Sequence, residues 1–119
     1  MLKKILIIDD EPGWVELLKN RLERDYRVFT ASDGDDGIRI AMNEKPDLIL
    51  CDVMMPRVDG YRVIHELKKY FGTSHIPILL LTAVQHTQSI FKAQALGAAD
   101  YVTKPVNFDE LPKLIRRHI

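Results

Sequence analysis

The chain has 119 residues, of which 46% are apolar and 29% charged, and its 17 basic side chains balance its 17 acidic ones. This length suits one domain, residues 1–119, whose core needs no disulfide or structural metal, and the composition excludes disordered and collagen-like chains. A net charge of zero and the lack of any block rich in Lys and Arg argue against direct binding to nucleic acid.

The sequence also bears on where the protein works. Cys51 is the one cysteine, so an internal disulfide cannot form, which fits a reducing compartment. No apolar run approaches the ~20 residues of a membrane-spanning helix. The apolar stretch Ile5–Ile8 has only four residues before three acidic ones, too few for a secretory signal. We therefore expect a cytoplasmic protein that does not insert into a membrane.

Five short apolar runs are typical of β-strands. Most of them are continuous rather than alternating, which is typical of a parallel sheet covered on both faces. In chain order the predicted strands are Leu2–Ile8, Tyr26–Ala31, Leu48–Cys51, Ile76–Leu81 and Tyr101–Val102.

The segments between these strands have apolar residues at helical spacing. Pro12 suits the first turn of the first helix, in which Trp14 is interpreted as a core or helix-surface residue. Ser32 with Asp35 resembles a capping box that opens the second helix, and Asp59 is expected to cap the third. The predicted apolar stripes lie, in chain order, within Trp14–Leu22, Ile38–Ala41, Gly60–Leu67, Ile90–Leu96 (ended by Gly97) and Phe108–Ile115.

The fifth helix contains Pro112, which would cost about 3 kcal/mol in a helix interior. A start capped by Asp109 rather than Asn107 would bring Pro112 into the first turn, where proline is tolerated. We therefore predict a late or irregular start to this helix.

Strands that alternate with helices predict an α/β fold, a fivefold βα repeat with a parallel sheet between two helical layers. In such a sheet the carboxyl ends of the strands meet at one edge, where ligands bind. Taken singly, the polar residues that follow the strands are most often caps, turn formers or surface groups. Their joint placement at one edge predicts a functional cleft, formed by Asp9, Asp10, Asp52, Thr82 and Lys104.

The residue types in this cleft indicate phosphoryl transfer. Three neighbouring carboxylates repel one another unless protons or a cation neutralise them. Oxygen ligands in a small open site favour Mg²⁺, which Asp9 and Asp10 can bind as a pair. Asp52 stands alone at its strand end and is the candidate nucleophile for an aspartyl phosphate. The metal ion and Lys104 would then offset charge on the phosphoryl oxygens.

At these residues the chain resembles the receiver domain of two-component response regulators, over essentially its whole length. The separations agree with that family, with 30 residues from Asp52 to Thr82 and 22 from Thr82 to Lys104. The matching segments are Asp9-Asp10, Asp52-Val53-Met54-Met55-Pro56, Asp59-Gly60, Thr82-Ala83, Gly97-Ala98 and Asp100-Tyr101-Val102-Thr103-Lys104-Pro105.

The resemblance implies a flavodoxin-like fold with strand order 2-1-3-4-5. It implies that Asp52 accepts a phosphoryl group from a phosphohistidine and that Lys104 pairs with a phosphoryl oxygen. The implied ligands of Mg²⁺ are Asp9, Asp10, Asp52 and the backbone carbonyl of Met54.

The resemblance also implies how the signal leaves the site. Thr82 is expected to move to hydrogen-bond the phosphoryl group, and Tyr101 to turn inward behind it. The output face is expected on the fourth helix, the fifth strand and the fifth helix. The bond between Lys104 and Pro105 is expected to be cis.

These features predict a signalling switch rather than an enzyme. The expected partners are a sensor histidine kinase or histidine phosphotransfer protein, and a downstream effector protein or an effector domain absent from this chain. A dimer that depends on phosphorylation is a further expectation, and the chain is interpreted as either a stand-alone receiver or the N-terminal receiver of a larger regulator. Met54 and Val84 occupy the two positions that vary in the family. Both are apolar and cannot orient an attacking water, so we expect a long-lived phosphoryl group.

Three other functions compete with this interpretation. A haloacid-dehalogenase-type phosphatase also uses a strand-end aspartate, but it needs Asp-x-Asp where this chain has Asp9-Asp10-Glu11. A flavodoxin-like FMN carrier needs phosphate-binding groups in its first loop, and an acidic loop would repel a phosphate. A receiver-like module that is never phosphorylated is disfavoured by the complete set of site residues, without being excluded.

Overall fold

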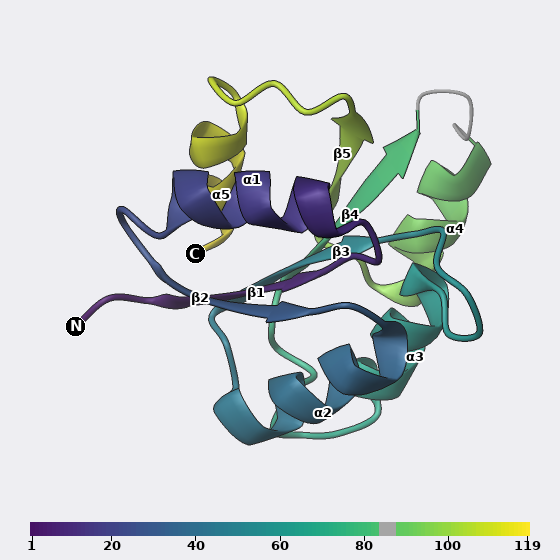
Figure 1. Cartoon of the computed structure of the whole chain (residues 1–119). Coiled ribbons are helices and arrows are strands. Elements are labelled where there is room, and N and C mark those ends of the chain that lie inside the picture. Colours follow the sequence, from purple (N-terminus) through teal and green to yellow (C-terminus); the bar gives the residue numbers. More distant parts are fainter. Residues whose placement is uncertain (84–87) are drawn as a thin grey trace.

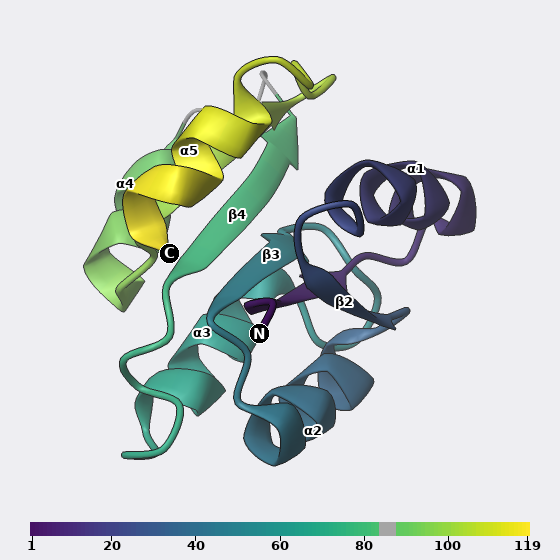
Figure 2. The same cartoon turned by 90° about the vertical axis from the view of Figure 1, so that its left-hand side faces the viewer.

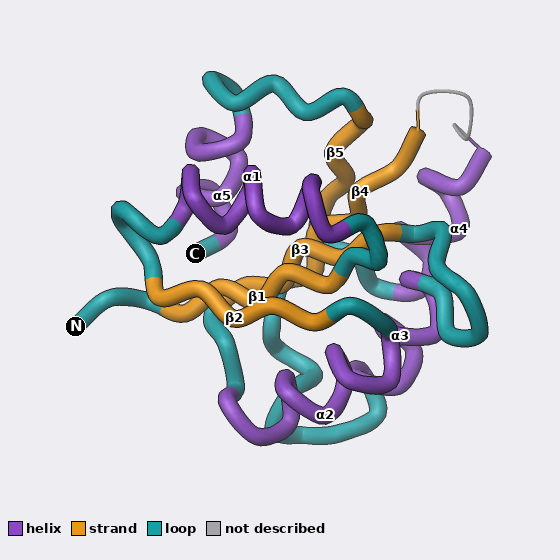
Figure 3. The backbone as a smooth tube through the Cα atoms, in the orientation of Figure 1, coloured by secondary structure: helices purple, strands orange, loops and turns teal. Residues whose placement is uncertain are grey.

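The computed structural model describes residues 1–83 and 88–119, which contain a five-stranded parallel sheet in the order β2-β1-β3-β4-β5 (Figures 1 and 3). This is the predicted flavodoxin-like order, so the fold prediction is confirmed. The strands are β1 (Lys4–Ile8), β2 (Arg27–Ala31), β3 (Leu48–Asp52), β4 (Ile78–Ala83) and β5 (Asp100–Lys104). The helices are α1 (Pro12–Leu22), α2 (Gly34–Glu44), α3 (Gly60–Lys68), α4 (Gln88–Leu96) and α5 (Leu111–His118).

Helices cover both faces of the sheet, because its strands carry apolar side chains on both sides (Figure 2). Ile5 and Ile7 of β1 pack in one core with residues of α1 and α5. Leu6 and Ile8 pack in the other core with residues of α2 and α3, which Leu96 of α4 joins. Successive side chains of a strand point to opposite faces. A continuous apolar run therefore fills both cores, and all these β1 side chains are fully buried.

The last two strands do not begin where their apolar runs predict. β4 begins at Ile78 rather than at Ile76, although Ile76 is buried in the core. β5 spans Asp100–Lys104, longer than the predicted Tyr101–Val102, because it is an edge strand with alternating burial rather than a continuous apolar run. Apolar character alone therefore misplaces the ends of these two strands.

The N-terminus of α2 corrects one prediction. Its N-cap is Asp33 rather than Ser32, and the Asp33 carboxylate accepts a hydrogen bond of 2.8 Å from the N–H of Asp36. The next residue, Gly34, packs so closely that a Cβ there would lie 2.6 Å from the carbonyl oxygen of Val58. The first residue of α2 therefore lies against the loop before α3, with no room for a larger side chain. The Asp59 cap of α3 is confirmed, since its carboxylate accepts from the N–H of Arg62 at 2.9 Å.

The late start of α5 is confirmed. The helix begins at Leu111, which places Pro112 in its first turn. The backbone nitrogens of the first turn make no intrahelical hydrogen bond, so the missing N–H of proline costs none there. The N-cap is Glu110, not the predicted Asp109. Asn107 instead closes the preceding turn, because its side-chain oxygen accepts from the N–H of Asp109 at 2.8 Å.

Two expected backbone features are also found. Gly97 follows α4 with a φ of 103°, a left-handed conformation that glycine adopts without strain. The peptide bond between Lys104 and Pro105 is cis. Among the described residues, no helix is long and apolar enough to cross a membrane.

Candidate functional site

The carboxyl ends of the parallel strands lie at one edge of the sheet, and three of the strands bring a charged predicted site residue there. Asp9 directly follows β1, Asp52 is the last residue of β3, and Lys104 is the last residue of β5. The strands run parallel and in register, with Ile8 beside Cys51, so their carboxyl ends lie at the same level. In Figure 1 the arrowheads of β4 and β5 lie on the side of the sheet away from the N-terminus.

A cluster of four carboxylates occupies this edge. One oxygen from each of Asp9, Asp10, Glu11 and Asp52 lies within 4.8 Å of the others. Asp9 is 1% exposed and Asp52 is 5% exposed, whereas Asp10 and Glu11 are exposed. The buried pair is held in place by the sheet, and the exposed pair leaves the cluster open to solvent. The structure therefore brings together the three aspartates predicted to meet at the ends of the parallel strands.

Glu11 is the member of the cluster that sequence reasoning did not assign to the site. It is the N-cap residue of α1, but its side chain makes no capping hydrogen bond. Its backbone N–H donates to Oδ1 of Asp9 at 3.0 Å, and its carboxylate lies 3.7 Å from the ammonium of Lys104. Its position could have indicated that it belongs to the site, because Glu11 directly follows the acidic pair in the loop after β1.

Lys104 contributes the ammonium that lies among these carboxylates. Its Nζ is 3.2 Å from Oδ2 of Asp9 and 3.4 Å from Oδ1 of Asp52. Burial lowers the pKa of Lys104, but the charges of Asp9 and Asp52 more than offset this, so its pKa lies above the ordinary value. Lys104 is therefore a permanent cation at this edge, and it bridges residues from two different strands.

The buried carboxylates are destabilised as anions. Burial, followed by the negative charge of Asp9, raises the pKa of Asp52 from 3.8 to about 6, although Lys104 acts in the opposite direction. Burial also raises the pKa of Asp9, against the lowering effects of the Glu11 N–H and of Lys104. The cluster has four carboxylates and the ammonium of Lys104 beside them, so its net charge at neutral pH is negative.

This donor set fits a small hard cation. The ligand atoms of the four clustered residues are all carboxylate oxygens, which favour Mg²⁺ or Ca²⁺ over softer metals. The exposed side of the cluster leaves room for water or phosphoryl oxygens, which Mg²⁺ usually retains as ligands. A bound cation would also relieve the repulsion that raises the pKa of Asp52. By this test the residues present suit Mg²⁺.

The other predicted site residues lie near this edge in different environments. Thr82 is 4% exposed, and its hydroxyl donates a long hydrogen bond of 3.4 Å to the carbonyl of Ala83. Tyr101, on the adjacent strand β5, is 36% exposed. Met54 is 65% exposed in the loop after β3. Val84, the second position linked to phosphoryl lifetime, lies outside the described residues. The roles assigned to these residues stay predictions.

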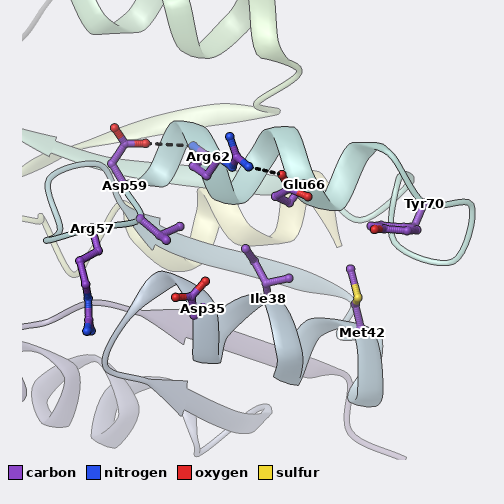
Figure 4. A pocket seen from close by; sticks show the side chains of 9 residues that line it. Asp35, Ile38, Met42, Arg57, Asp59, Arg62, Glu66 and Tyr70 are labelled. Carbon is purple, nitrogen blue, oxygen red and sulfur yellow. Dashed lines mark hydrogen bonds and ion pairs between the residues drawn. The ribbon is translucent and has the colours of Figure 1, made fainter.

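A separate groove of ≈ 540 Å³ lies between α2 and α3 (Figure 4). Both of its arginines have acidic partners: Arg62 lies 3.0 Å from Glu66, and Arg57 lies 3.9 Å from Asp33. None of the four cluster carboxylates lines it, so this groove is separate from the acidic cluster at the strand ends. The lining residues are Asp35, Ile38, Met42, Arg57, Val58, Asp59, Arg62, Glu66 and Tyr70.

Comparison with known proteins identifies the class to which this fold and site belong. The family model described as response regulator receiver domain matches residues 5–116, and the chain belongs to this family. A receiver domain is a signalling switch of two-component systems rather than a classical enzyme. The family assignment excludes the phosphatase and FMN-carrier alternatives.

Individual relatives support the assignment. The alkaline phosphatase synthesis transcriptional regulatory protein PhoP of Bacillus subtilis is 47% identical over 106 residues, which is 88% of this chain and 43% of PhoP. The chain spans less than half the length of the curated relatives it matches, so their whole-protein activities do not transfer to it directly.

Solved structures agree with the fold. The chemotaxis protein CheY4 of Vibrio cholerae superposes with a TM-score of 0.94 at 28% identity, covering 100% of both chains. The receiver domain of the sensor histidine kinase PA1611 from Pseudomonas aeruginosa superposes with a TM-score of 0.90 at 28% identity, covering 99% of this chain and 98% of that one. That structure is described as having a magnesium ion coordinated in its active-site cleft.

Proposed function

We propose that Asp52 is the phosphoacceptor of this receiver domain. A carboxylate oxygen of Asp52 attacks the phosphorus of a phosphohistidine on a partner protein, and the bond from phosphorus to the imidazole nitrogen breaks. The electron pair of that bond stays on the imidazole, which leaves as the neutral group after taking a proton from water. The observation that carries the proposal is the burial of Asp52 beside two other aspartates, with the Lys104 ammonium 3.4 Å from Oδ1.

The acidic residues around Asp52 would hold Mg²⁺. Asp9, Asp10, Asp52 and the backbone carbonyl of Met54 are the proposed ligands. Mg²⁺ supplies positive charge that offsets the phosphoryl oxygens when it is bound. Asp9 is oriented for this role by the N–H of Glu11, which occupies its Oδ1 at 3.0 Å. The magnesium ion described in the related receiver domain of PA1611 supports this choice of cation.

Lys104 and Thr82 are proposed to contact the phosphoryl oxygens. The Lys104 ammonium would exchange part of its contact with Asp9 and Asp52 for a charge-assisted bond to the incoming group. The Thr82 hydroxyl makes only a 3.4 Å bond to Ala83, which a stronger bond to an anionic oxygen would replace.

The movement of Thr82 would then reach the surface through β5. Thr82 pairs with Thr103 of β5 in the sheet. Thr103 is two residues from Tyr101, whose side chain is partly exposed in this structure. We propose that Tyr101 turns inward when Thr82 moves and changes the face formed by α4, β5 and α5. An added phosphoryl group carries up to two negative charges, enough to bias a two-state element by a few kcal/mol.

The same proposal covers the partners and the domain. Residues 1–119 would act as one receiver domain in the cytoplasm, phosphorylated by a sensor histidine kinase or a histidine phosphotransfer protein. The output would go to an effector protein, or to an effector domain outside this chain, as the transcriptional regulators among its relatives suggest. Direct contact with nucleic acid, insertion into a membrane and turnover as an enzyme form no part of the proposal.

Intact-mass measurement after incubation with acetyl phosphate tests the phosphoacceptor. The parent chain should gain one phosphoryl group in the presence of Mg²⁺ and none with a chelator. Asp52→Asn should gain none. The matched control is Asp25→Asn, which changes an exposed carboxylate in the turn before β2, at the opposite edge of the sheet.

Each outcome of this experiment has a defined meaning. An adduct that needs both Mg²⁺ and Asp52, and that persists in Asp25→Asn, supports the proposal. An adduct on Asp52→Asn would move the phosphoacceptor to another residue. No adduct on folded parent protein, with acetyl phosphate or with a phosphorylated histidine partner, would favour a module that signals without phosphorylation.

A further inference from the structure

Trp14 lies in the first turns of α1, beside the site. The Nζ of Lys104 is 5.8 Å from the centroid of the Trp14 ring. The same ring packs against Phe108, with centroids 5.9 Å apart and planes tilted by 49°. Trp14 therefore lies between the cation at the end of β5 and the loop that leads into α5.

We propose that Trp14 is a positioning residue for the ammonium of Lys104. The aromatic ring attracts the cation and restrains the flexible lysine side chain in the range where it contacts Asp9 and Asp52. This inference rests on the proposed function, because Lys104 has a catalytic role only if phosphoryl transfer occurs at Asp52. The contact itself can be tested independently of that reaction.

The geometry supports a contact between cation and ring. An ammonium within about 6 Å of an aromatic centroid is attracted to the ring, more strongly when both groups are shielded from water. The Lys104 side chain is only 23% exposed, so solvent screens this attraction weakly. A lysine stem has many rotamers. A ring beside the ammonium reduces the number that remain accessible.

Packing alone does not explain an indole at this position. Its Nε1 is buried and has no hydrogen-bond partner among the described residues. A buried N–H without a partner destabilises the folded state, so an apolar side chain of similar size would fill this space at lower cost. The aromatic face toward Lys104 gives the ring a use other than filling the core.

Phe108 and Arg21 keep the ring in place. Phe108 belongs to the same core as Trp14, and its carbonyl accepts a 3.4 Å hydrogen bond from the guanidinium of Arg21 on α1. These contacts join α1 to the loop that follows Lys104. Trp14 and Lys104 therefore lie on α1 and at the end of β5, and the contacts of Phe108 hold these two elements together.

Three variants separate positioning from packing. Trp14→Leu keeps an apolar side chain and removes the aromatic face, whereas Trp14→Phe keeps a face. Leu22→Val is the packing control, because Leu22 is buried in α1 within the same core. Two quantities are measured for each: the rate of phosphoryl uptake from acetyl phosphate with Mg²⁺, and the rate at which acetic anhydride modifies Lys104 in chelator, read by peptide mass spectrometry.

Lys92 serves as the internal reference for the modification experiment. Its ammonium lies 4.5 Å from the ring centroid of Tyr61 and belongs to α4 rather than to the site. In Trp14→Leu, modification of Lys104 should rise and phosphoryl uptake should fall, each by about threefold to tenfold. Modification of Lys92 should not change. Trp14→Phe should recover most of both effects, and Leu22→Val should lower thermal stability while leaving both rates near those of the parent.

The outcomes distinguish failure of the positioning role of Trp14 from failure of the proposed phosphoryl transfer to Asp52. Parent-like rates in Trp14→Leu would overturn the positioning role, as would a Trp14→Phe variant that is as defective as Trp14→Leu, or equal losses in Leu22→Val. If the parent takes up no phosphoryl group, the proposed function fails and the modification rates decide alone. In that case a rise confined to Lys104 supports the contact, and no rise overturns it.

Discussion

The ammonium of Lys104 lies 3.4 Å from Oδ1 of Asp52, although β4 separates their two strands in the sheet. The same ammonium is 3.2 Å from Oδ2 of Asp9, which follows β1 on the far side of β3. One cation thus bridges the carboxyl ends of three strands. It leaves the carboxylates in excess, and that excess governs how the site responds to protons and metal ions.

Removing the charge of Asp52 should stabilise the metal-free protein at neutral pH. Its pKa is raised from 3.8 to about 6, so the folded state binds this proton more tightly than the unfolded state. The resulting stabilisation is fully present below pH 3.8 and is lost as the pH rises through 6. At pH 7.5 in chelator, Asp52→Asn should therefore raise the free energy of unfolding by about 1–2 kcal/mol, part of the gain being offset by the lost contact with Lys104.

Urea denaturation of the parent and Asp52→Asn at several pH values measures this effect. The difference should shrink as the pH falls below 6 and vanish below pH 3.8, where Asp52 is protonated in both the folded and the unfolded state. Asp25→Asn is the control, and it should show no comparable gain. A difference that stays constant with pH would mean that repulsion and burial of the charge are not its cause.

Mg²⁺ should stabilise the folded protein. A ligand that binds only the folded state raises the midpoint of thermal unfolding as its concentration rises. The shift should be smaller at pH 5 than at pH 7.5, because Asp52 must lose its proton for the ion to bind. Asp9→Asn should remove most of the shift and Asp25→Asn none of it. An equal shift in Asp9→Asn would place the cation elsewhere.

Gly60→Ala should damage the site through the backbone. A Cβ on Gly60 would lie 2.5 Å from the carbonyl oxygen of Asp52, so β3 and the start of α3 must move apart. Overpacking of this kind costs about 1–3 kcal/mol. We expect a lower free energy of unfolding together with weaker Mg²⁺-dependent stabilisation.

Gly13→Ala is the matched control for Gly60→Ala. It adds the same methyl group at the start of α1, where a Cβ would meet nothing within 4 Å. Because alanine favours helix over glycine, this variant should gain up to about 1 kcal/mol. A Gly60→Ala variant as stable as the parent would show that the contact with Asp52 relaxes without cost.

The lifetime of the phosphoryl group should depend on Met54. This apolar side chain is exposed in the loop after β3 and offers no strong hydrogen bond to an attacking water. Met54→Asn introduces such a group and should speed loss of the phosphoryl group several-fold, as followed by intact mass after the phosphodonor is removed. Met54→Leu, which stays apolar, should behave like the parent. An unchanged rate in Met54→Asn would count against the predicted long lifetime.

Local sequence signals were reliable where one residue decides the structure. Asp59 caps α3, Gly97 ends α4, and Pro112 falls in the first turn of a late α5, all as expected. The cap of α2 was wrong because Ser32 and Asp33 are adjacent residues of similar capping ability. Asp33 is the cap because its carboxylate accepts from the N–H of Asp36, and Gly34, the next residue, packs closely against Val58 of a distant loop.

The chain's own pattern determined the architecture and the site's main members. Apolar runs alternating with helical segments lead to a parallel sheet, and right-handed crossovers bring the residues after each strand to one edge. The positions of Asp9, Asp10, Asp52 and Lys104 at the ends of parallel strands therefore predicted that they would meet.

Only the tertiary structure decided which side chains contact Lys104. Glu11 and Trp14 approach it because α1 begins at Pro12, soon after β1 ends at Ile8, and packs against the loop before α5. These contacts join residues about 90 positions apart in the chain, and they depend on loop paths and rotamers that no local pattern encodes. The alternation of strands and helices determines that the site residues meet at the carboxyl ends of the strands. The packing of α1 determines that Glu11 and Trp14 lie beside Lys104.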